Sequence, residues 1–305
     1  MPPLAPVSDK GGEVEYIRPA DWPDALALKT EHPAALPVCG GTDVMVDINF
    51  ARERPSILLD LSHLFELEQW ERQNGAVDLG AGVTYTRIID ELSAELPALA
   101  MASRTVGSPQ IRNRGTVGGN LATASPAGDA HPPLLATGAI VHAESMRGAR
   151  EISIEEFFTG PKQSLLEPDE LIRSVSVPVA KGPQQFSKVG TRNAMVIAVT
   201  SFALGLDLEN RQFGTGIGSA GPTPLQAIEA ADYLGQELEK GDYWEDYRHL
   251  PPQLVDRFAE LVAAAARPID DVRGTASYRT HALRIMAGRT LGWVWESAEG
   301  YRPPC

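Results

Sequence analysis

The chain has 305 residues, 43% of them hydrophobic, so it is long enough to bury a full core and to form two or three modules. Its net charge of −13 disfavours a nucleic-acid partner, because phosphate binding needs a basic surface. No apolar run approaches the roughly 20 residues of a membrane-spanning helix, and the N-terminal MPPLAP lacks the features of a secretory signal.

The N-terminal 60 residues predict alternating strands and helices behind a flexible lead at 1–12. Residues 22–30 predict a helix with Asp21 as its N-cap, and Asp43 stands where a second helix should begin. Three segments are typical of short strands, and they lie at 13–18, 36–39 and 56–61. This β-α-β-α-β order predicts a small sheet.

Residues 62–180 predict a second subdomain that begins with a hairpin. Its strands, 69–72 and 76–79, flank Asn74-Gly75, a pair that favours a tight primed turn. Apolar residues recur at helical spacing over 84–96 and predict a helix there. Further strands are expected at 140–144, 152–154 and 171–177, the first two joined across Arg147-Gly148.

Lys181-Gly182-Pro183 indicates a boundary before a smaller C-terminal domain, residues 181–305. Three segments predict an antiparallel sheet there, at 186–189, 196–208 and 213–217. Three more predict helices, at 225–238, 252–266 and 277–295. We therefore expect an α+β fold in two parts, 13–180 and 181–305, with the first part divided at about residue 61.

Two glycine-rich turns are the most informative features of the chain. They are Gly40-Gly41-Thr42-Asp43 and Thr116-Val117-Gly118-Gly119-Asn120. Paired glycines let backbone N–H groups approach a ligand closely, and phosphates gain most from such amides. Two such turns suit a ligand with two phosphates, although each turn alone is also typical of a simple connection between strands.

A third glycine pattern, GIGSAG at 216–221, fits the GxGxxG of nicotinamide dinucleotide sites. In that site the last glycine lies inside a helix packed on a parallel strand. Here Pro222 and Pro224 follow at once and obstruct a helix. The pattern therefore disfavours a nicotinamide dinucleotide site.

Cysteine and histidine usage excludes several kinds of site. The only cysteines, Cys39 and Cys305, cannot hold an iron–sulfur cluster, which normally takes four thiolates, or a zinc site built from cysteine pairs. The six histidines show no metal-binding spacing, so no metal site is expected. Two cysteines without an export signal indicate a reducing compartment, and we expect the cytoplasm.

Residues 38–44 and 106–121 resemble the two FAD-binding loops of the molybdenum hydroxylase flavoproteins. These are the medium subunits of carbon monoxide dehydrogenase and its bacterial relatives, and the FAD domain of xanthine dehydrogenase. The resemblance covers about residues 13–296 and continues through the segments 124–129, 188–192, 221–224 and 271–279.

The resemblance implies a two-part FAD-binding domain of the PCMH/molybdopterin-dehydrogenase type, followed by the smaller C-terminal domain. FAD should be held noncovalently, since the second loop has no histidine or cysteine. The residues that the resemblance assigns to the cofactor site are Pro37, Val38, Cys39, Gly40, Gly41, Thr42, Asp43, Val44, Val106, Thr116, Val117, Gly118, Gly119, Asn120, Ser125, Asp129, Ile172, Lys188 and Ile197.

For several of these residues a purely structural role is an alternative to cofactor binding. Asp129 either anchors hydroxyls of the cofactor, as the resemblance implies, or caps a helix at 130–137. Lys188 matches a position that contacts the flavin side of FAD, but a surface lysine would look the same. Ile172 matches an apolar wall residue and Ile197 a residue that covers the isoalloxazine, and core packing explains both equally well.

Arg112 and Arg114 either screen phosphate charge or face a partner, and the sequence does not choose. The chain also lacks any cysteine between residues 40 and 304, so it cannot carry the extra iron–sulfur cluster of the hydroxybenzoyl-CoA reductase branch.

The function that the resemblance implies is electron transfer without a catalytic acid or base in this chain. A large molybdopterin-binding subunit and a small [2Fe–2S] subunit would hold the other cofactors, in a dimer of heterotrimers. The hydroxylated substrate and the electron acceptor stay open. The alternatives are a stand-alone FAD-dependent oxidase and a cofactor-free scaffold subunit.

Overall fold

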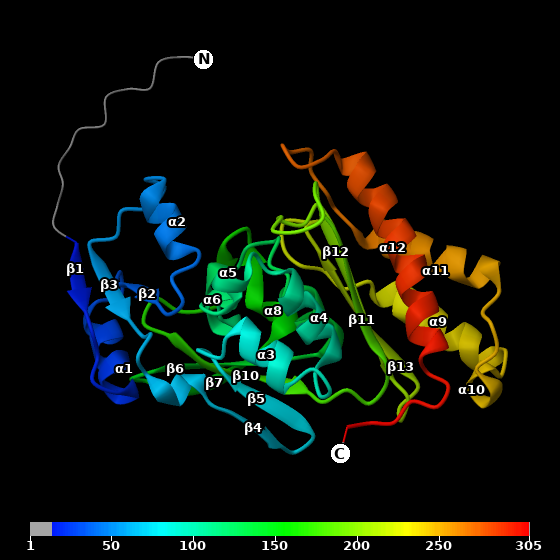
Figure 1. The fold of residues 1–305 in the computed structure, drawn as a ribbon, viewed down its shortest axis with the longest axis horizontal. Coiled ribbons are helices and arrows are strands. Elements are labelled where there is room, and N and C mark those ends of the chain that lie inside the picture. The colour runs from blue at the N-terminus through cyan, green and yellow to red at the C-terminus, as the bar shows by residue number, and fades with distance from the viewer. Residues whose placement is uncertain (1–13, 305) are drawn as a thin grey trace, which may run out of the picture.

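The computed structural model describes residues 14–304, so the lead expected at 1–12 lies outside the described residues. Figure 1 shows three parts along the long axis of the molecule. A small N-terminal part carries β1–β3, a central part surrounds β10, and a C-terminal part contains β11–β13 with the last helices.

The N-terminal part is the predicted small sheet. Its strand order is β1-β3-β2, and both pairs are parallel. Asp21 caps the first helix by accepting a hydrogen bond from the Asp24 amide at 2.9 Å, as predicted. The elements are β1 (Glu15–Ile17), α1 (Trp22–Glu31), β2 (Leu36–Val38), α2 (Val44–Asn49) and β3 (Ile57–Asp60).

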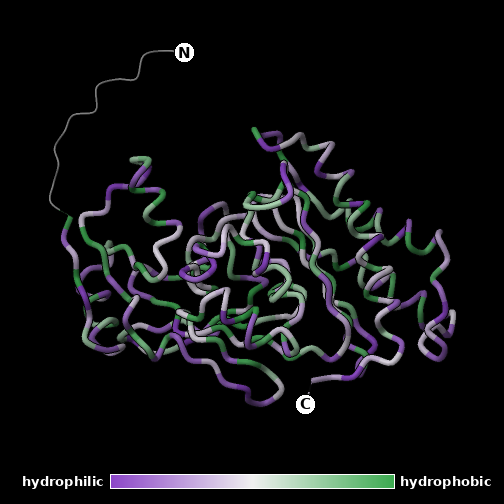
Figure 2. The backbone as a smooth tube through the Cα atoms, in the orientation of Figure 1, coloured by the Kyte–Doolittle hydropathy of each residue, from purple (hydrophilic) through white to green (hydrophobic). Residues whose placement is uncertain are grey.

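The central part is built on a five-stranded antiparallel sheet of order β4-β5-β10-β6-β7. Asn74 and Gly75 both have positive φ, 51° and 77°, as the predicted primed turn requires. The outer strand β4 is largely hydrophilic (Figure 2) and exposed, whereas the central strand β10 is mostly buried. The elements are η1 (Phe65–Glu68), β4 (Trp70–Gln73), β5 (Ala76–Gly80), β6 (Ile140–Ser145), β7 (Gly148–Ser153) and β10 (Leu171–Pro178).

Short helices cover one face of this sheet. The helix predicted over 84–96 is shorter and ends at Glu91, with Leu92 as its C-cap. Pro97 accounts for the non-helical backbone of Leu96 alone, because a proline restricts only the residue before it. The remaining central elements are α3 (Tyr85–Glu91), α4 (Pro97–Thr105), α5 (Pro109–Arg112), α6 (Val117–Thr123), α7 (His131–Thr137), α8 (Ile154–Phe157), β8 (Phe158–Gly160) and β9 (Gln163–Ser164).

The C-terminal part contains the predicted three-stranded antiparallel sheet, of order β11-β12-β13. Helices cover its outer face (Figure 1), and Phe202, Phe258 and Leu291 are buried between the two layers. The elements are β11 (Gln184–Val189), β12 (Thr200–Asp207), β13 (Gln212–Gly218), α9 (Ile228–Lys240), α10 (Tyr243–Asp246), α11 (Pro252–Ala265) and α12 (Ala276–Glu296).

Gly214 and Gly216, the first glycine of the GIGSAG pattern, pack the C-terminal part against the central part. A Cβ added at Gly214 would lie 1.8 Å from the Ala136 carbonyl oxygen, and one at Gly216 would lie 2.0 Å from that of Pro132. Strand β13 therefore packs backbone to backbone on α7. Because β13 pairs antiparallel with β12, the segment lacks the parallel setting of a nicotinamide dinucleotide site.

None of the helices within residues 14–304 combines the length and apolar composition that a bilayer crossing requires.

Candidate functional site

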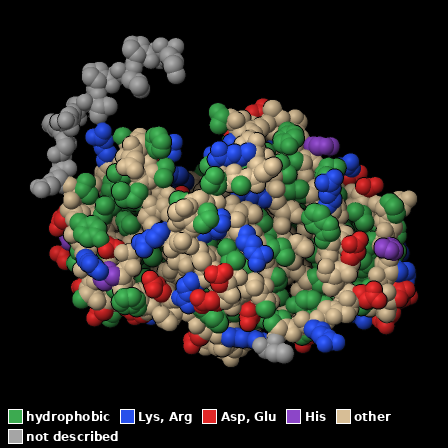
Figure 3. Space-filling view, in the orientation of Figure 1, with side chains coloured by type: hydrophobic (Ala, Val, Ile, Leu, Met, Phe, Trp, Pro, Cys, Tyr) green, Lys and Arg blue, Asp and Glu red, His purple; other side chains and the backbone are tan. Residues whose placement is uncertain are grey.

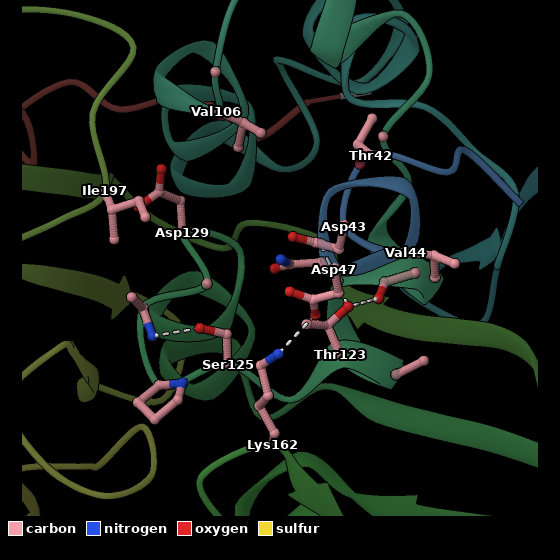
Figure 4. Close-up of a pocket in the computed structure, with 18 of the residues that line it drawn as sticks. Thr42, Asp43, Val44, Asp47, Val106, Thr123, Ser125, Asp129, Lys162 and Ile197 are labelled. Atoms are coloured by element: carbon pink, nitrogen blue, oxygen red, sulfur yellow. Dashed lines mark hydrogen bonds and ion pairs between the residues drawn. The ribbon is translucent and has the colours of Figure 1, made fainter. Parts of the chain in front are cut away.

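A cavity of about 910 Å³ lies where the three parts of the chain meet. In the space-filling view the outline of the molecule dips between the N-terminal part and the remainder (Figure 3). Figure 4 shows Thr42, Asp43 and Val44 on one wall of the cavity, and Asp129 and Ile197 on the opposite wall. The volume is at the upper end of the range for small-molecule sites.

The first glycine turn presents bare amides to this cavity. It connects β2 to α2, and Gly41 adopts a left-handed φ of 73°. The N–H groups of residues 40–43 donate no hydrogen bond to any acceptor within residues 14–304. Residues 40–42 are half-buried and Asp43 is exposed. Consecutive backbone N–H groups without a protein acceptor form a concave surface that suits an anionic ligand.

The first glycine turn touches the residues immediately before the second turn, although more than 70 residues separate them in the sequence. A Cβ added at Gly40 would lie 2.0 Å from the carbonyl oxygen of Arg114, and one at Gly115 would lie 3.4 Å from Thr42 Oγ1. The absence of side chains at these positions therefore allows the turns to form one continuous wall.

The second turn begins α6 and uses part of its polar backbone for packing. Thr116 caps the helix by accepting from the Gly119 amide at 3.0 Å. The Gly118 amide donates to the Ala81 carbonyl at 3.2 Å, and a Cβ there would lie 2.5 Å from that of Ala81. Asn120 lines the cavity, and its Oδ1 is buried without a hydrogen-bond partner among the described residues.

Asp129 forms a buried ion pair that joins the central and C-terminal parts. Its Oδ2 accepts from Lys188 Nζ on β11 and from Thr105 Oγ1, and both charged side chains are 8% exposed. Burial raises the pKa of Asp129, and the Lys188 ammonium acts in the opposite direction. The other oxygen, Oδ1, has no partner within residues 14–304.

This pairing decides one alternative left open by the sequence. The N-cap of α7 is Ala130, and no side chain caps that helix. Asp129 therefore does not serve as a helix cap. Its carboxylate is held by Lys188 beside the cavity instead.

His131 lies directly behind the second turn. It is fully buried, its ring centroid lies 4.5 Å from that of Phe158, and its Nε2–H donates to the Asn120 carbonyl at 3.3 Å. Burial lowers the pKa of His131 to about 4, so the ring is neutral near pH 7. Gly128 is required beside it, since a Cβ there would lie 2.3 Å from the ring.

A polar clip connects α2 to the central part at the mouth of the cavity. Lys162 Nζ donates to Asp47 Oδ2 at 2.8 Å, and Thr123 Oγ1 donates to Asp43 Oδ2 at 3.4 Å (Figure 4). The Lys162 contact lowers the pKa of Asp47, whereas burial raises that of Asp43. The clip holds the N-terminal part over the cavity.

Sequence reasoning assigned no role to Arg279, which supports the C-terminal wall. Its side chain is buried and donates to the carbonyls of Val199 at 2.7 Å and Ser219 at 2.6 Å, and to the Asp271 carboxylate. Tyr85 was also missed. It lines the cavity, its hydroxyl has no partner in residues 14–304, and burial raises its pKa well above the ordinary value.

The structure brings most of the expected cofactor residues to one cavity. Those that line it are Pro37, Cys39, Gly40, Gly41, Thr42, Asp43, Val44, Val106, Thr116, Gly119, Asn120, Ser125, Asp129 and Ile197. Lys188 lines an adjoining cavity, and Ile172 packs in the core of the central part. Val38, Val117 and Gly118 lie outside the lining of both cavities.

These observations test whether the residues present suit a dinucleotide. Free amides in the first turn suit phosphate oxygens, and the unpaired oxygens of Asn120 and Asp129 suit sugar hydroxyls. The exposed side chain of Ile197, 53% accessible, offers an apolar surface at the opposite wall. The donor set therefore fits a bound flavin dinucleotide.

Comparison with known proteins places the chain in a family. The family described as "FAD binding domain in molybdopterin dehydrogenase" matches residues 12–180. The chain therefore belongs to this family of FAD-binding domains, and its relatives are subunits of oxidoreductase complexes.

Two curated relatives and one solved structure illustrate the likeness. The xanthine dehydrogenase FAD-binding subunit of Escherichia coli O157:H7 is 28% identical over 93% of this chain and 97% of the relative. The nicotinate dehydrogenase FAD-subunit of Eubacterium barkeri is 32% identical over 73% of this chain and 79% of the relative. A chain of carbon monoxide dehydrogenase from Hydrogenophaga pseudoflava superposes with a TM-score of 0.85 at 26% identity, covering 93% of this chain and 98% of that one.

Proposed function

We propose that this chain is the FAD-binding, electron-transfer subunit of a molybdenum-containing hydroxylase or dehydrogenase. It would accept electrons from [2Fe–2S] clusters of a small partner subunit and pass them to an external acceptor. A large subunit would hold the molybdenum cofactor, in a dimer of heterotrimers in the cytoplasm. The names of the relatives, which are FAD subunits of xanthine and nicotinate dehydrogenases, support this assignment.

The observation that carries the proposal is the row of free amides at residues 40–43, placed against the second glycine turn. We assign these amides to the pyrophosphate, and the unpaired oxygens of Asn120 and Asp129 to hydroxyl groups of the cofactor. Ile197 would cover one face of the flavin ring. Bound FAD supplies the redox chemistry, since it accepts and releases one or two electrons.

The remaining assigned residues would act from behind the cavity lining. Val38, Val117, Gly118 and Ile172 would fix the shape of the two turns and of the sheet beneath them. Lys188 would hold the Asp129 carboxylate in place and supply positive charge beside the cavity. None of these roles requires proton transfer by a side chain, so we assign no catalytic acid or base.

We propose noncovalent binding of FAD. Cys39 is the one cysteine among the described residues, and burial raises the pKa of its thiol. A protonated thiol is a poor nucleophile. Covalent attachment through this side chain is therefore disfavoured.

The test is the absorption spectrum of the purified full-length chain before and after acid precipitation. Flavin bands that move into the supernatant as FAD support the cofactor assignment and noncovalent binding. A colourless protein that takes up no added FAD leaves the scaffold alternative. Flavin reduction by a small alcohol or amine without partner subunits supports the oxidase alternative, whereas reduction that needs a reduced [2Fe–2S] partner supports electron transfer.

A further inference from the structure

A second cavity, of about 420 Å³, lies beside the first. Its walls come from the end of α4, the start of α5, and the loop that follows β11. The two cavities share Gly107, Met195 and Val196 in their linings. A molecule in the second cavity would therefore stand next to whatever occupies the first.

The lining of this second cavity carries only positive charge. Its charged side chains are Arg104, Arg112, Lys188 and Arg192, and no carboxylate lines it. Lys188 is paired with Asp129, but the three arginines form no ion pair with any residue in 14–304. In a chain with a net charge of −13, three unpaired guanidinium groups around one cavity favour the binding of an anion there.

Neutral backbone oxygens hold two of the arginines in position and do not neutralise the positive charge of the guanidinium groups. Arg112 Nη1 donates to the carbonyls of residues 104, 106 and 107 at 3.1–3.2 Å. Arg192 donates through Nε and Nη2 to the Met195 carbonyl, at 3.0 Å for Nε. The N–H groups left over, including all of those on Arg104, have no partner among the described residues.

We propose that the second cavity binds the phosphate group of a small molecule. A planar guanidinium matches phosphate oxygens in a two-pronged arrangement. A phosphate also carries enough charge, about −1.5 to −2 near pH 7 when it is a monoester, to neutralise more than one arginine. The proposal rests on the proposed function for its location, because the site adjoins the cavity assigned to FAD.

The phosphate could belong to two kinds of molecule. One is a dinucleotide that takes electrons from the flavin. The other is a phosphorylated effector that does not react. Both would present the same group to Arg104, Arg112 and Arg192, so binding and electron transfer must be measured separately.

The binding experiment uses the FAD-loaded full-length protein and titration calorimetry at low and high salt. The probes are inorganic phosphate, AMP, ADP-ribose and NAD⁺. We expect at least one probe to bind, with an affinity that falls as salt rises. Arg104→Gln and Arg192→Gln should each weaken that binding tenfold or more. The matched control is Arg257→Gln, which removes an exposed arginine paired with Glu260 on α11 and should leave binding unchanged.

The two sources are separated by adding the binding probe to protein whose flavin has been reduced without oxygen. With an acceptor dinucleotide, one hydride moves from the reduced flavin to NAD⁺, and FAD and NADH form in equal amounts. With an effector, the probe binds and the flavin stays reduced. Either result supports the phosphate site.

Three results would overturn the proposal. No probe binds, or the probes bind equally to the arginine variants, or the variants lose FAD as well as the probe. The last result would assign the arginines to the FAD site. The flavin absorbance of the unaltered protein is recorded in parallel, so a failure of the proposed function appears there and is distinguishable. If the arginine variants instead weaken association with a partner subunit while no probe binds, the cavity receives an acidic side chain of that partner, and the proposal is wrong.

Discussion

The α-carbon of Gly40 lies so close to the backbone of Arg114 that an added Cβ would stand 2.0 Å from the Arg114 carbonyl oxygen. A real Cβ does not tolerate this approach, and the obstacle is backbone rather than a movable side chain. The contact is the point at which the two glycine turns close on each other beside the cavity.

Gly40→Ala should therefore separate the turns and displace the free amides at residues 40–43. Overpacking of this kind costs about 1–3 kcal/mol of stability, and we expect a tenfold or larger loss of FAD affinity. The measurement is flavin absorbance per protein after dialysis with FAD. Gly235→Ala in α9 is the control, since a Cβ there meets nothing within 4 Å. Equal flavin content in both variants would contradict the assignment.

Lys188→Met should leave the Asp129 carboxylate buried without its counter-ion. Breaking one partner of a buried pair costs about 3–5 kcal/mol. We expect a lower denaturation midpoint and weaker FAD binding. Adding Asp129→Asn to Lys188→Met should restore part of the stability, because no charge is then stranded. A double-mutant cycle from urea unfolding measures this coupling, and strict additivity of the two substitutions would contradict the pair.

The exposed pair of Lys181 with Glu209 provides the comparison for that cycle. Its partners are well solvated, so Lys181→Met should change stability much less than Lys188→Met.

His131 should make stability depend on pH below neutrality. Between its ordinary pKa of 6.5 and the folded value of about 4, the unfolded histidine binds a proton that the folded one does not. Stability therefore falls as pH falls through this range, by a total of about 3 kcal/mol from this group. His131→Gln removes the titrating group, so the variant should lose less stability than the parent protein between pH 7 and pH 4. Parallel curves of unfolding free energy against pH would show the expectation to be wrong.

Gly216→Ala should disturb the contact between the central and C-terminal parts, where the new Cβ would meet the Pro132 carbonyl oxygen at 2.0 Å. We expect a loss of about 1–3 kcal/mol, seen as a lower thermal midpoint and faster proteolysis. Gly292→Ala in α12 is the control, because a Cβ there meets nothing within 4 Å. An unchanged midpoint for Gly216→Ala would mean that α7 can move away from β13 at little cost.

Local patterns in the sequence were sufficient to predict much of the fold. Asp21, Asn74-Gly75 and the apolar segments specify a cap, a tight turn and strands through interactions between near neighbours. The helix over 84–96 was predicted too long, because it ends at Glu91 although apolar residues continue at helical spacing to Leu96.

Residue patterns alone assigned the two glycine turns to the site, and the family resemblance added Val106, Ser125, Asp129 and Ile197, which also line the cavity. The roles of other site residues depend on contacts between residues far apart in the sequence, and no local pattern encodes such contacts. Gly118 packs on Ala81, Arg279 holds the carbonyls of two distant loops, and Asp129 is paired by a lysine from the next part of the chain. The charged lining around Arg104 and Arg192 likewise forms only when α4 and the loop after β11 meet.

The walls of the large cavity come from all three parts of the chain, including the first turn, the second turn and the segment that leads into α12. A molecule that binds only this closed arrangement stabilises every wall at once. We therefore expect the bound cofactor to hold the three parts of the chain together. In chains made without flavin, the contacts between the three parts should be lost before the core of any one part unfolds. The supply of cofactor during synthesis should therefore influence how much intact protein accumulates.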